Sequence, residues 1–209
     1  MSSTLDDLPQ LRCLKRPLGP VTADAQAAPW PELSAIALRE TATGEPPKQA
    51  TWFKTAWNDQ ELRVLFWIED THIVAAMTER DSLLYLEDVV ELFLDPVGDL
   101  ETYFEFEVNA LNTVLDLVLR REETEYHKNF QWQCEGLRTA AQRHPNGWCA
   151  EISIPFASLG ANPQGARWRA NFYRIDHPEQ APLELSAWSP TRQRNFHLPE
   201  RFGVLEFTE

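Results

Sequence analysis

The sequence predicts an all-β protein, an antiparallel β-sandwich. Apolar and polar residues alternate along short runs, which is the period of a strand with one buried face. Turn residues separate these runs at regular intervals, and most of the 15 prolines lie between them. Convincing helical periodicity is confined to two short segments, residues 71–77 and 156–159. Short alternating strands with frequent turns favour a sandwich or barrel over any helical architecture.

The first half of the chain is expected to contribute five strands. Residues 51–57 are aromatic and β-rich, and Asn58-Asp59 then turns the chain into residues 61–69, a run apolar enough for a central strand. Further strands are expected at 89–94, 103–108 and 113–119. Strict alternation in 103–108 places the phenylalanines on one face and Glu105 and Glu107 on the other.

The second half is expected to contribute a hairpin and two more strands. Residues 137–143 and 148–154 flank Asn146-Gly147, a strong hairpin-turn signal. Residues 168–175 and 203–207 are the last two strands, and the polar stretch 120–128 is expected to be a connection. We interpret residues 1–20 as an N-terminal lead-in segment and 21–209 as one β-sandwich domain, which suits a chain of 209 residues.

The charge of the chain limits its ligands. Lys and Arg total 19 against 32 Asp and Glu, for a formal net charge of −13. This charge repels phosphate backbones and anionic membranes, so we expect neither nucleic acid nor membrane as a partner. A neutral ligand, a cation such as calcium or a basic protein is easier to accommodate.

Cysteine usage and the chain start leave the compartment open. Cys13, Cys134 and Cys149 show no CxxC spacing, and a regular hairpin would hold Cys149 away from Cys134, so free thiols are expected. No segment is apolar for long enough to span a bilayer, and residues 1–20 do not resemble a secretory signal. The protein is therefore expected to be cytoplasmic, or secreted with its signal removed.

Catalytic signatures are missing from the sequence. The nucleophile-elbow, HExxH and glycine-rich phosphate motifs are absent, and the five histidines show no ligand-like pairing. Glu91 and Glu107 could form a carboxylate pair, but a chain with 32 acids offers many such pairs. Aromatic side chains beside polar ones are more informative, because a flat ring can cover the apolar face of a sugar.

Six blocks of sequence follow one another in a characteristic order. They are RDSLLYLEDVVELFLDP at 80–96, YFEFEVN at 103–109, GW leading into EISIP at 147–155, NFYRID at 171–176, AWSP at 187–190 and FHLPERFG at 196–203. Over roughly residues 21–207, this order resembles the family 9 carbohydrate-binding modules. The resemblance implies a DOMON-like sandwich, of jelly-roll or immunoglobulin-like type, that binds an oligo- or polysaccharide without catalysis.

The resemblance also implies particular site residues. A sugar would lie between two aromatic rings, which fall at Tyr85 and Phe196. Glu91 takes the position of a carboxylate that hydrogen-bonds the sugar, and Gln193 lies near an amide position. The best-known members have two tryptophans where this chain has a tyrosine and a phenylalanine.

Charge at the site departs from the family pattern, because Glu107 takes a position where the family can place a sugar-binding arginine. Arg80, Arg174 or Arg169 could supply the missing cation. Family members also carry calcium, which prefers oxygen ligands. The acidic loop 95–101 could supply these from three carboxylates, those of Asp95, Asp99 and Glu101.

Two other functions stay open from the sequence. Some DOMON-like sandwiches hold haem, for which Met77 with His72 or His197 could form an axial pair. A hydrolase, or an accessory domain of one, would use paired acids that include Glu91. Because a binding module normally serves a catalytic domain, a carbohydrate-active enzyme on another chain is an expected partner.

Overall fold

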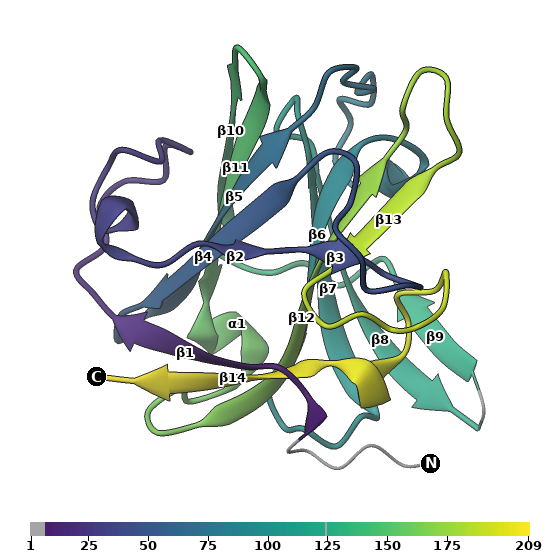
Figure 1. Ribbon diagram of the computed structural model, residues 1–209. Coiled ribbons are helices and arrows are strands. Elements are labelled where there is room, and N and C mark those ends of the chain that lie inside the picture. Colours follow the sequence, from purple (N-terminus) through teal and green to yellow (C-terminus); the bar gives the residue numbers. More distant parts are fainter. Residues whose placement is uncertain (1–6, 124) are drawn as a thin grey trace.

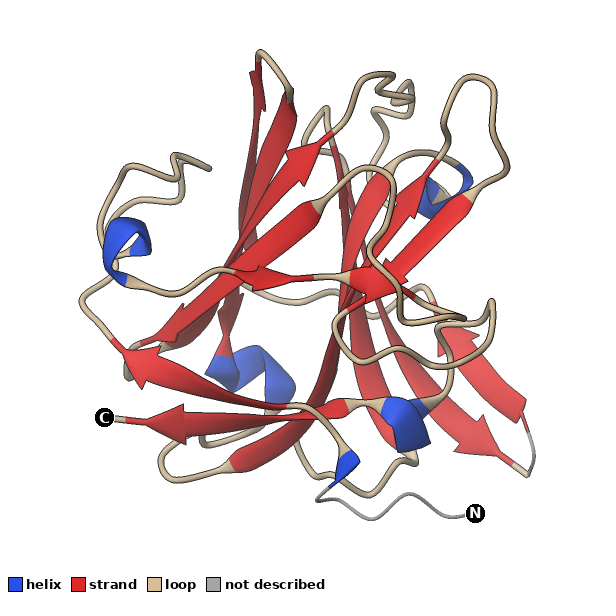
Figure 2. Ribbon diagram, in the orientation of Figure 1, coloured by secondary structure: helices blue, strands red, loops and turns tan. Residues whose placement is uncertain are grey.

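The computed structural model describes residues 7–123 and 125–209, and strands dominate it (Figure 2). The strands are β1 (Gln10–Lys15), β2 (Ile36–Ala37), β3 (Arg39–Glu40), β4 (Thr51–Trp57), β5 (Glu61–Glu69), β6 (Val89–Asp95), β7 (Thr102–Asn109), β8 (Val114–Glu122), β9 (Glu125–Asn129), β10 (Arg138–His144), β11 (Gly147–Pro155), β12 (Arg167–Asp176), β13 (Glu184–Ala187) and β14 (Gly203–Thr208). The helical elements are α1 (Phe156–Leu159) and the 3₁₀ turns η2 (Trp30–Glu32), η3 (Leu84–Leu86) and η4 (Pro199–Arg201).

The strands form one continuous hydrogen-bonded path that curls on itself (Figure 1). Its order is β10-β11-β5-β4-β1-β14-β12-β6-β7-β8-β9, with β2, β3 and β13 attached at its side. The all-β prediction is confirmed, but the expectation of a purely antiparallel sheet is wrong. Strand β1 pairs in parallel with both β14 and β4. Parallel neighbours need long connections. The segment between β1 and β4 is long, and β1 and β14 are the first and last strands of the chain.

The two halves of the curled sheet pack face to face around the main core. The rings of Phe53 on β4 and Phe172 on β12 stack at a centroid distance of 3.9 Å. Trp57, Trp148 and Trp168 are buried in this core, as tryptophans at strand positions usually are. Side chains alternate along β6, so Val90, Leu92 and Leu94 also face inward.

A second hydrophobic cluster lies on the opposite face of β12, β6, β7 and β8. Phe93, Tyr103 and Tyr173 belong to it, together with Phe196 and Phe202 from the chain segment that crosses this face. The alternation that directs one set of side chains into the main core thus directs a second set outward. This outer cluster supports the candidate site.

Most of the predicted elements are present. All nine predicted strands occur with ends shifted by at most a few residues, and the predicted helix at Phe156–Leu159 is α1. The helix expected at 71–77 is wrong. Residues 73–77 run without regular structure, because the Asp88 and Glu87 carboxylates accept the backbone N–H groups of this segment and hold it extended.

Strands that the sequence did not reveal are short or polar. Glu125–Asn129 forms β9 within the stretch expected to be a connection, and β2 and β3 have two residues each. Part of the predicted lead-in, Gln10–Lys15, is a strand of the sheet. The domain boundary at residue 20 stays a prediction.

The cysteines are free and buried, as expected. In the β10–β11 hairpin Cys149 lies opposite Gln142, away from Cys134. Burial raises the pKa of each thiol to about 12, so all three are protonated and unreactive at neutral pH. Among the described residues, no helix is long and apolar enough to cross a membrane.

Candidate functional site

A groove of about 380 Å³ opens over the outer cluster, between the strands and the chain segment that leads to η4. Its wall includes Tyr85 from η3, Lys128 from β9 and Leu185 from β13. Six polar side chains line it, namely Glu91, Glu105, Lys128, Arg194, Asn195 and His197. Pockets of this size hold small ligands when convergent polar groups line an apolar wall.

Two neighbouring strands place acids on the floor of the groove. Glu91 on β6 lies directly across from Glu107 on β7, and Glu105 follows on the same face of β7. Glu91 and Glu105 line the groove, whereas Glu107 lies behind them, fully buried. Burial is the main cause that raises the pKa of all three carboxyls. The charge of Glu105 adds to this effect at Glu91 and Glu107, and Lys128 opposes it.

The two aromatic side chains of the groove differ in exposure. Tyr85 is half-buried, and its ring is free of aromatic partners among the described residues. Phe196 is only 7% exposed, because its ring stacks on Tyr173 at a centroid distance of 4.1 Å. The Tyr173 hydroxyl also donates to the Phe196 carbonyl oxygen. Phe196 therefore forms a fixed wall, and Tyr85 is the ring available to a ligand.

Lys128 brings a positive charge to the groove. Its ammonium donates to His197 Nε2 at 3.0 Å, lies 4.0 Å from a Glu105 oxygen and lies 5.7 Å from the centre of the Tyr85 ring. Since lysine can only donate, His197 Nε2 accepts, and the imidazole proton lies on Nδ1, 2.8 Å from the Tyr103 hydroxyl. Burial and Lys128 lower the pKa of His197 to about 3, so this histidine is neutral.

The structure brings together some of the predicted site residues and separates others. Tyr85, Glu91 and Phe196 line the same groove. Glu107 is adjacent but lies outside its lining. Gln193 is exposed and outside the groove, whereas the residues just after it, Arg194 and Asn195, contribute to the wall.

None of the three arginines expected to replace the missing cation lines the groove. Arg80 pairs with Asp116. Arg169 donates to the Phe202 carbonyl oxygen at 2.7 Å and so anchors the segment around η4. Arg174 points to the other face of β12, because its neighbours Tyr173 and Ile175 take the groove face.

Sequence reasoning missed Glu105 and Lys128. A signal for Glu105 existed, because alternation along β7 puts Glu105 on the same face as Glu107. No local signal existed for Lys128, which lies in a strand with polar residues on both faces. Its position depends on the pairing of β9 with β8.

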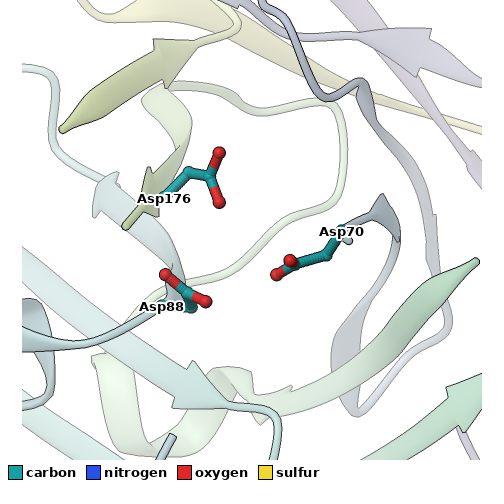
Figure 3. Close-up of side chains that lie close together, drawn as sticks. All are labelled: Asp70, Asp88 and Asp176. Atoms are coloured by element: carbon teal, nitrogen blue, oxygen red, sulfur yellow. The ribbon is translucent and has the colours of Figure 1, made fainter. Parts of the chain in front are cut away.

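A separate acid cluster joins the ends of β5, β6 and β12. The carboxylates of Asp70, Asp88 and Asp176 point toward a common space (Figure 3). Arg174 donates to Asp70 at 3.0 Å and to Asp176 at 2.7 Å. Asp88 accepts backbone N–H groups on both oxygens. The protein's own donors thus engage every oxygen of these three carboxylates.

The carboxylates proposed for calcium are engaged by other groups of the protein. Asp95 accepts the N–H groups of Gly98 and Leu100 at 2.6 and 2.9 Å. Asp99 accepts the N–H of Glu101 at 2.9 Å, and Glu101 itself lies 3.7 Å from Arg121. Asp95 and Asp99 therefore cap the turn and Glu101 pairs with an arginine, and these contacts do not favour a shared ion. A calcium ion in this loop stays a prediction.

The residues considered for haem offer no matched axial pair. Both ring nitrogens of His197 are hydrogen-bonded, to Tyr103 and Lys128. His72 is exposed, and Met77 packs against the outer cluster. Nothing in these contacts favours haem ligation.

Comparison with known proteins gives a family and a shared fold. A family model described as "Carbohydrate family 9 binding domain-like" matches residues 22–209. No curated protein matches the chain. A protein of Bacteroides uniformis, provisionally named carbohydrate-binding, superposes with a TM-score of 0.78 at 19% identity, over 95% of this chain and 99% of the other.

Two further structures are of a family 9 carbohydrate-binding module from Caldicellulosiruptor kristjanssonii. The complex with glucose superposes with a TM-score of 0.71 at 18% identity, over 96% of each chain. The complex with cellotriose gives a TM-score of 0.70 at 18% identity, over 94% of this chain and 93% of the other. At these identities the superpositions show a shared fold.

Proposed function

The chain belongs to the carbohydrate family 9 binding domain-like family, and from this membership we propose that it binds carbohydrate and catalyses no reaction. The site is the groove over the outer cluster. The same membership supports a jelly-roll, DOMON-like arrangement of the curled sheet. A partner enzyme on another chain is part of the proposal, since binding modules target catalytic domains to their substrates.

The observation that carries this proposal is the mixed lining of the groove. An accessible aromatic ring, Tyr85, stands beside buried carboxylates and a lysine. A sugar presents apolar C–H faces and many hydroxyls. The Tyr85 ring can cover a C–H face of the sugar. Glu91 and Glu105 can accept hydrogen bonds from its hydroxyls, and Lys128 can donate hydrogen bonds to them. Because Lys128 lies near one face of the Tyr85 ring, a sugar would stack on the other face.

The sugar class follows from the relatives. The Caldicellulosiruptor module forms complexes with glucose and cellotriose. We therefore infer that glucose and short glucose oligosaccharides are the first ligands to test. Phe196 is fixed against Tyr173, so a single accessible ring is expected to give weaker binding than a clamp of two rings.

The carboxylate geometry supports the absence of catalysis. Glycosidases hold two carboxyl groups about 5–9.5 Å apart on opposite sides of the scissile bond. Here Glu91 and Glu105, the two acids that line the groove, come from adjacent strands, and one oxygen of each lies within 4.8 Å of the other. They approach a bound sugar from the same side.

Titration calorimetry against mono- and oligosaccharides, with calcium present, tests the proposal. Tyr85→Ala should weaken binding by about tenfold or more with little change in melting temperature, because Tyr85 is half-buried and its ring stacks on no other. Leu86→Ala is the matched control, since Leu86 is adjacent, 56% exposed and outside the groove lining. Unchanged affinity in Tyr85→Ala would show that the site is elsewhere, and no binding across the panel would refute the function.

A further inference from the structure

The floor of the groove holds three carboxylates with almost no exposure to solvent. Glu91 and Glu105 are each 2% exposed, and Glu107 is completely buried. One oxygen from each lies within 4.8 Å of the oxygens of the other two. The pleat of β6 and β7 enforces this approach, because all three side chains leave the same face of adjacent strands.

Four oxygens of these carboxylates lack a donor from the rest of the described chain, and Glu105 and Glu107 contact each other. Within the part of the chain that the structure describes, Glu91 Oε1, Glu105 Oε2 and both oxygens of Glu107 accept no hydrogen bond. Lys128, 4.0 Å from Glu105, is the nearest cation that contacts the cluster, and its ammonium already donates to His197. When all three are ionised, three carboxylates against one ammonium leave two negative charges unbalanced, and buried charges are costly unless compensated.

The aspartate cluster in the same protein is a useful contrast. There, Arg174 and backbone N–H groups satisfy the carboxylates of Asp70, Asp88 and Asp176. None of those six oxygens is without a hydrogen-bond partner among the described residues. Both clusters set three carboxylates against one cation, so they differ in hydrogen bonding: the aspartate oxygens are all satisfied by the protein, whereas four oxygens under the groove are left open to an external cation.

The position of Glu107 restricts the size of that cation. Glu107 lies behind Glu91 and Glu105 and is outside the groove lining. An ammonium group on a ligand lying in the groove would meet Glu91 and Glu105 first and leave both Glu107 oxygens without a partner. A small ion seated among the three oxygens contacts all of them.

We propose that Glu91, Glu105 and Glu107 bind a divalent cation of the calcium class beneath the groove, and that this ion coordinates sugar hydroxyls. Calcium binds six to eight oxygens at about 2.3–2.6 Å, so two of its ligands can lie up to about 5 Å apart. The 4.8 Å spread of the three oxygens falls within that limit. The two positive charges of the ion would balance the two excess negative charges of the fully ionised cluster.

The coordination number connects the ion to the ligand of the groove. Three carboxylates leave several positions of calcium open, and Glu91 and Glu105 place these positions at the groove floor. Vicinal hydroxyls of a sugar are suitable oxygen ligands. This part of the inference rests on the proposed carbohydrate-binding function, whereas the ion site itself does not.

Ion binding is tested without sugar. Calcium is titrated calorimetrically into EDTA-treated protein, and Mn²⁺ binding is followed by electron paramagnetic resonance. About one ion should bind at the cluster, and Glu107→Gln and Glu105→Gln should each weaken its affinity by about tenfold or more. Both variants keep the side-chain shape and remove a buried charge, so folding is checked by circular dichroism. Asp88→Asn in the aspartate cluster is the matched control, and Asp99→Asn reports separately on calcium binding by the loop after β6.

Ion and sugar binding are then measured together. Sugar affinity should fall by about tenfold or more when EDTA removes the ion, and Tyr85→Ala should lose sugar while keeping the ion. If Asp88→Asn or Asp99→Asn abolishes ion binding instead, or if no ion binds, the proposed site is wrong. If no ion binds, the acids share protons, and sugar binding that persists would leave the proposed function intact.

The two proposals can also fail separately. Ion binding through Glu107 with no binding of any sugar would refute the function and keep the ion site. If sugar affinity is the same with and without the bound ion, the ion does not coordinate the sugar hydroxyls.

Discussion

Asp88, at the start of β6, carries a buried charge that depends on pH. Its two oxygens accept the N–H groups of Val74 at 2.6 Å and His177 at 2.7 Å. Burial is the main cause that raises the pKa of Asp88 to about 6, and the charges of Asp70 and Asp176 add to it against these hydrogen bonds. At neutral pH the folded protein therefore keeps this carboxylate ionised at a cost.

The pH dependence of stability should reveal this cost. The folded state keeps the Asp88 proton up to about pH 6, whereas the unfolded chain loses it near the ordinary pKa of 3.8. The contribution of Asp88 to stability is thus full below a pH of 3.8 and is lost as the pH rises from there through the folded pKa of about 6. Relative to wild type, Asp88→Asn should gain on the order of 2–3 kcal/mol between about pH 4 and pH 7.

Urea unfolding at a series of pH values measures this difference. Asp88→Asn also loses accepted hydrogen bonds, but that loss is the same at every pH and cancels from the slope. Asp99→Asn, on an exposed loop, is the control and should follow wild type. A difference between Asp88→Asn and wild type that stays constant with pH would contradict the assignment.

At the scale of elements, the β10–β11 hairpin depends on one glycine. Gly147 follows the turn at Asn146 and has a φ of +151°. A Cβ atom placed there would lie 2.1 Å from the Ile68 carbonyl oxygen. Gly147 also pairs with Glu69, so the turn end of the hairpin docks directly onto β5. Any larger residue would push the hairpin away from its neighbour.

Gly147→Ala should therefore destabilise the protein by about 1–3 kcal/mol through steric overlap and backbone strain. Chemical denaturation monitored by tryptophan fluorescence measures the loss. Gly19→Ala is the matched control, because nothing lies within 4 Å of its added Cβ and its φ is not positive. Equal effects of the two substitutions would show that the close approach at Gly147 is not important for stability.

At the scale of the whole molecule, β1 joins the two halves of the sheet. It pairs with β14 over Gln10–Leu14 and with β4 at Leu14 and Lys15. Cys13 from this strand is completely buried in the main core. Without β1, both β4 and β14 would expose an unpaired edge, and the continuous path of strands would be interrupted between them.

Deletion of residues 1–16 should therefore lower stability by about 3 kcal/mol or more, which corresponds to a fall in melting temperature of roughly 6–12 °C. Differential scanning calorimetry measures this change. Deletion of residues 1–6 leaves β1 intact and is the control. If the two truncated proteins melt together, β1 contributes little to the closure of the sheet.

The candidate site could be predicted only in part. Tyr85, Glu91 and Phe196 were found because their blocks resemble a family, and the structure brings these residues to one groove. Gln193 lies outside this groove, whereas the next two residues line it, in a loop where no periodicity fixes the side-chain direction. Lys128 could not be foreseen, because its place beside Glu105 depends on the register between β8 and β9.

The sequence by itself determined the local structure. Apolar, β-rich and alternating runs defined the strands from β4 to β8, Asn146-Gly147 defined the hairpin, and the free cysteines agreed with that hairpin. These features depend on chemistry within a few neighbouring residues, which a sequence displays directly.

Only the tertiary structure decided how distant segments meet. It placed β1 in parallel between β4 and β14, fixed Phe196 against Tyr173, and gathered Glu91, Glu105 and Glu107 beneath one groove. Each of these contacts joins residues that are separated along the chain. Their energies depend on strand register and on burial, which are properties of the folded protein rather than of any short stretch of sequence.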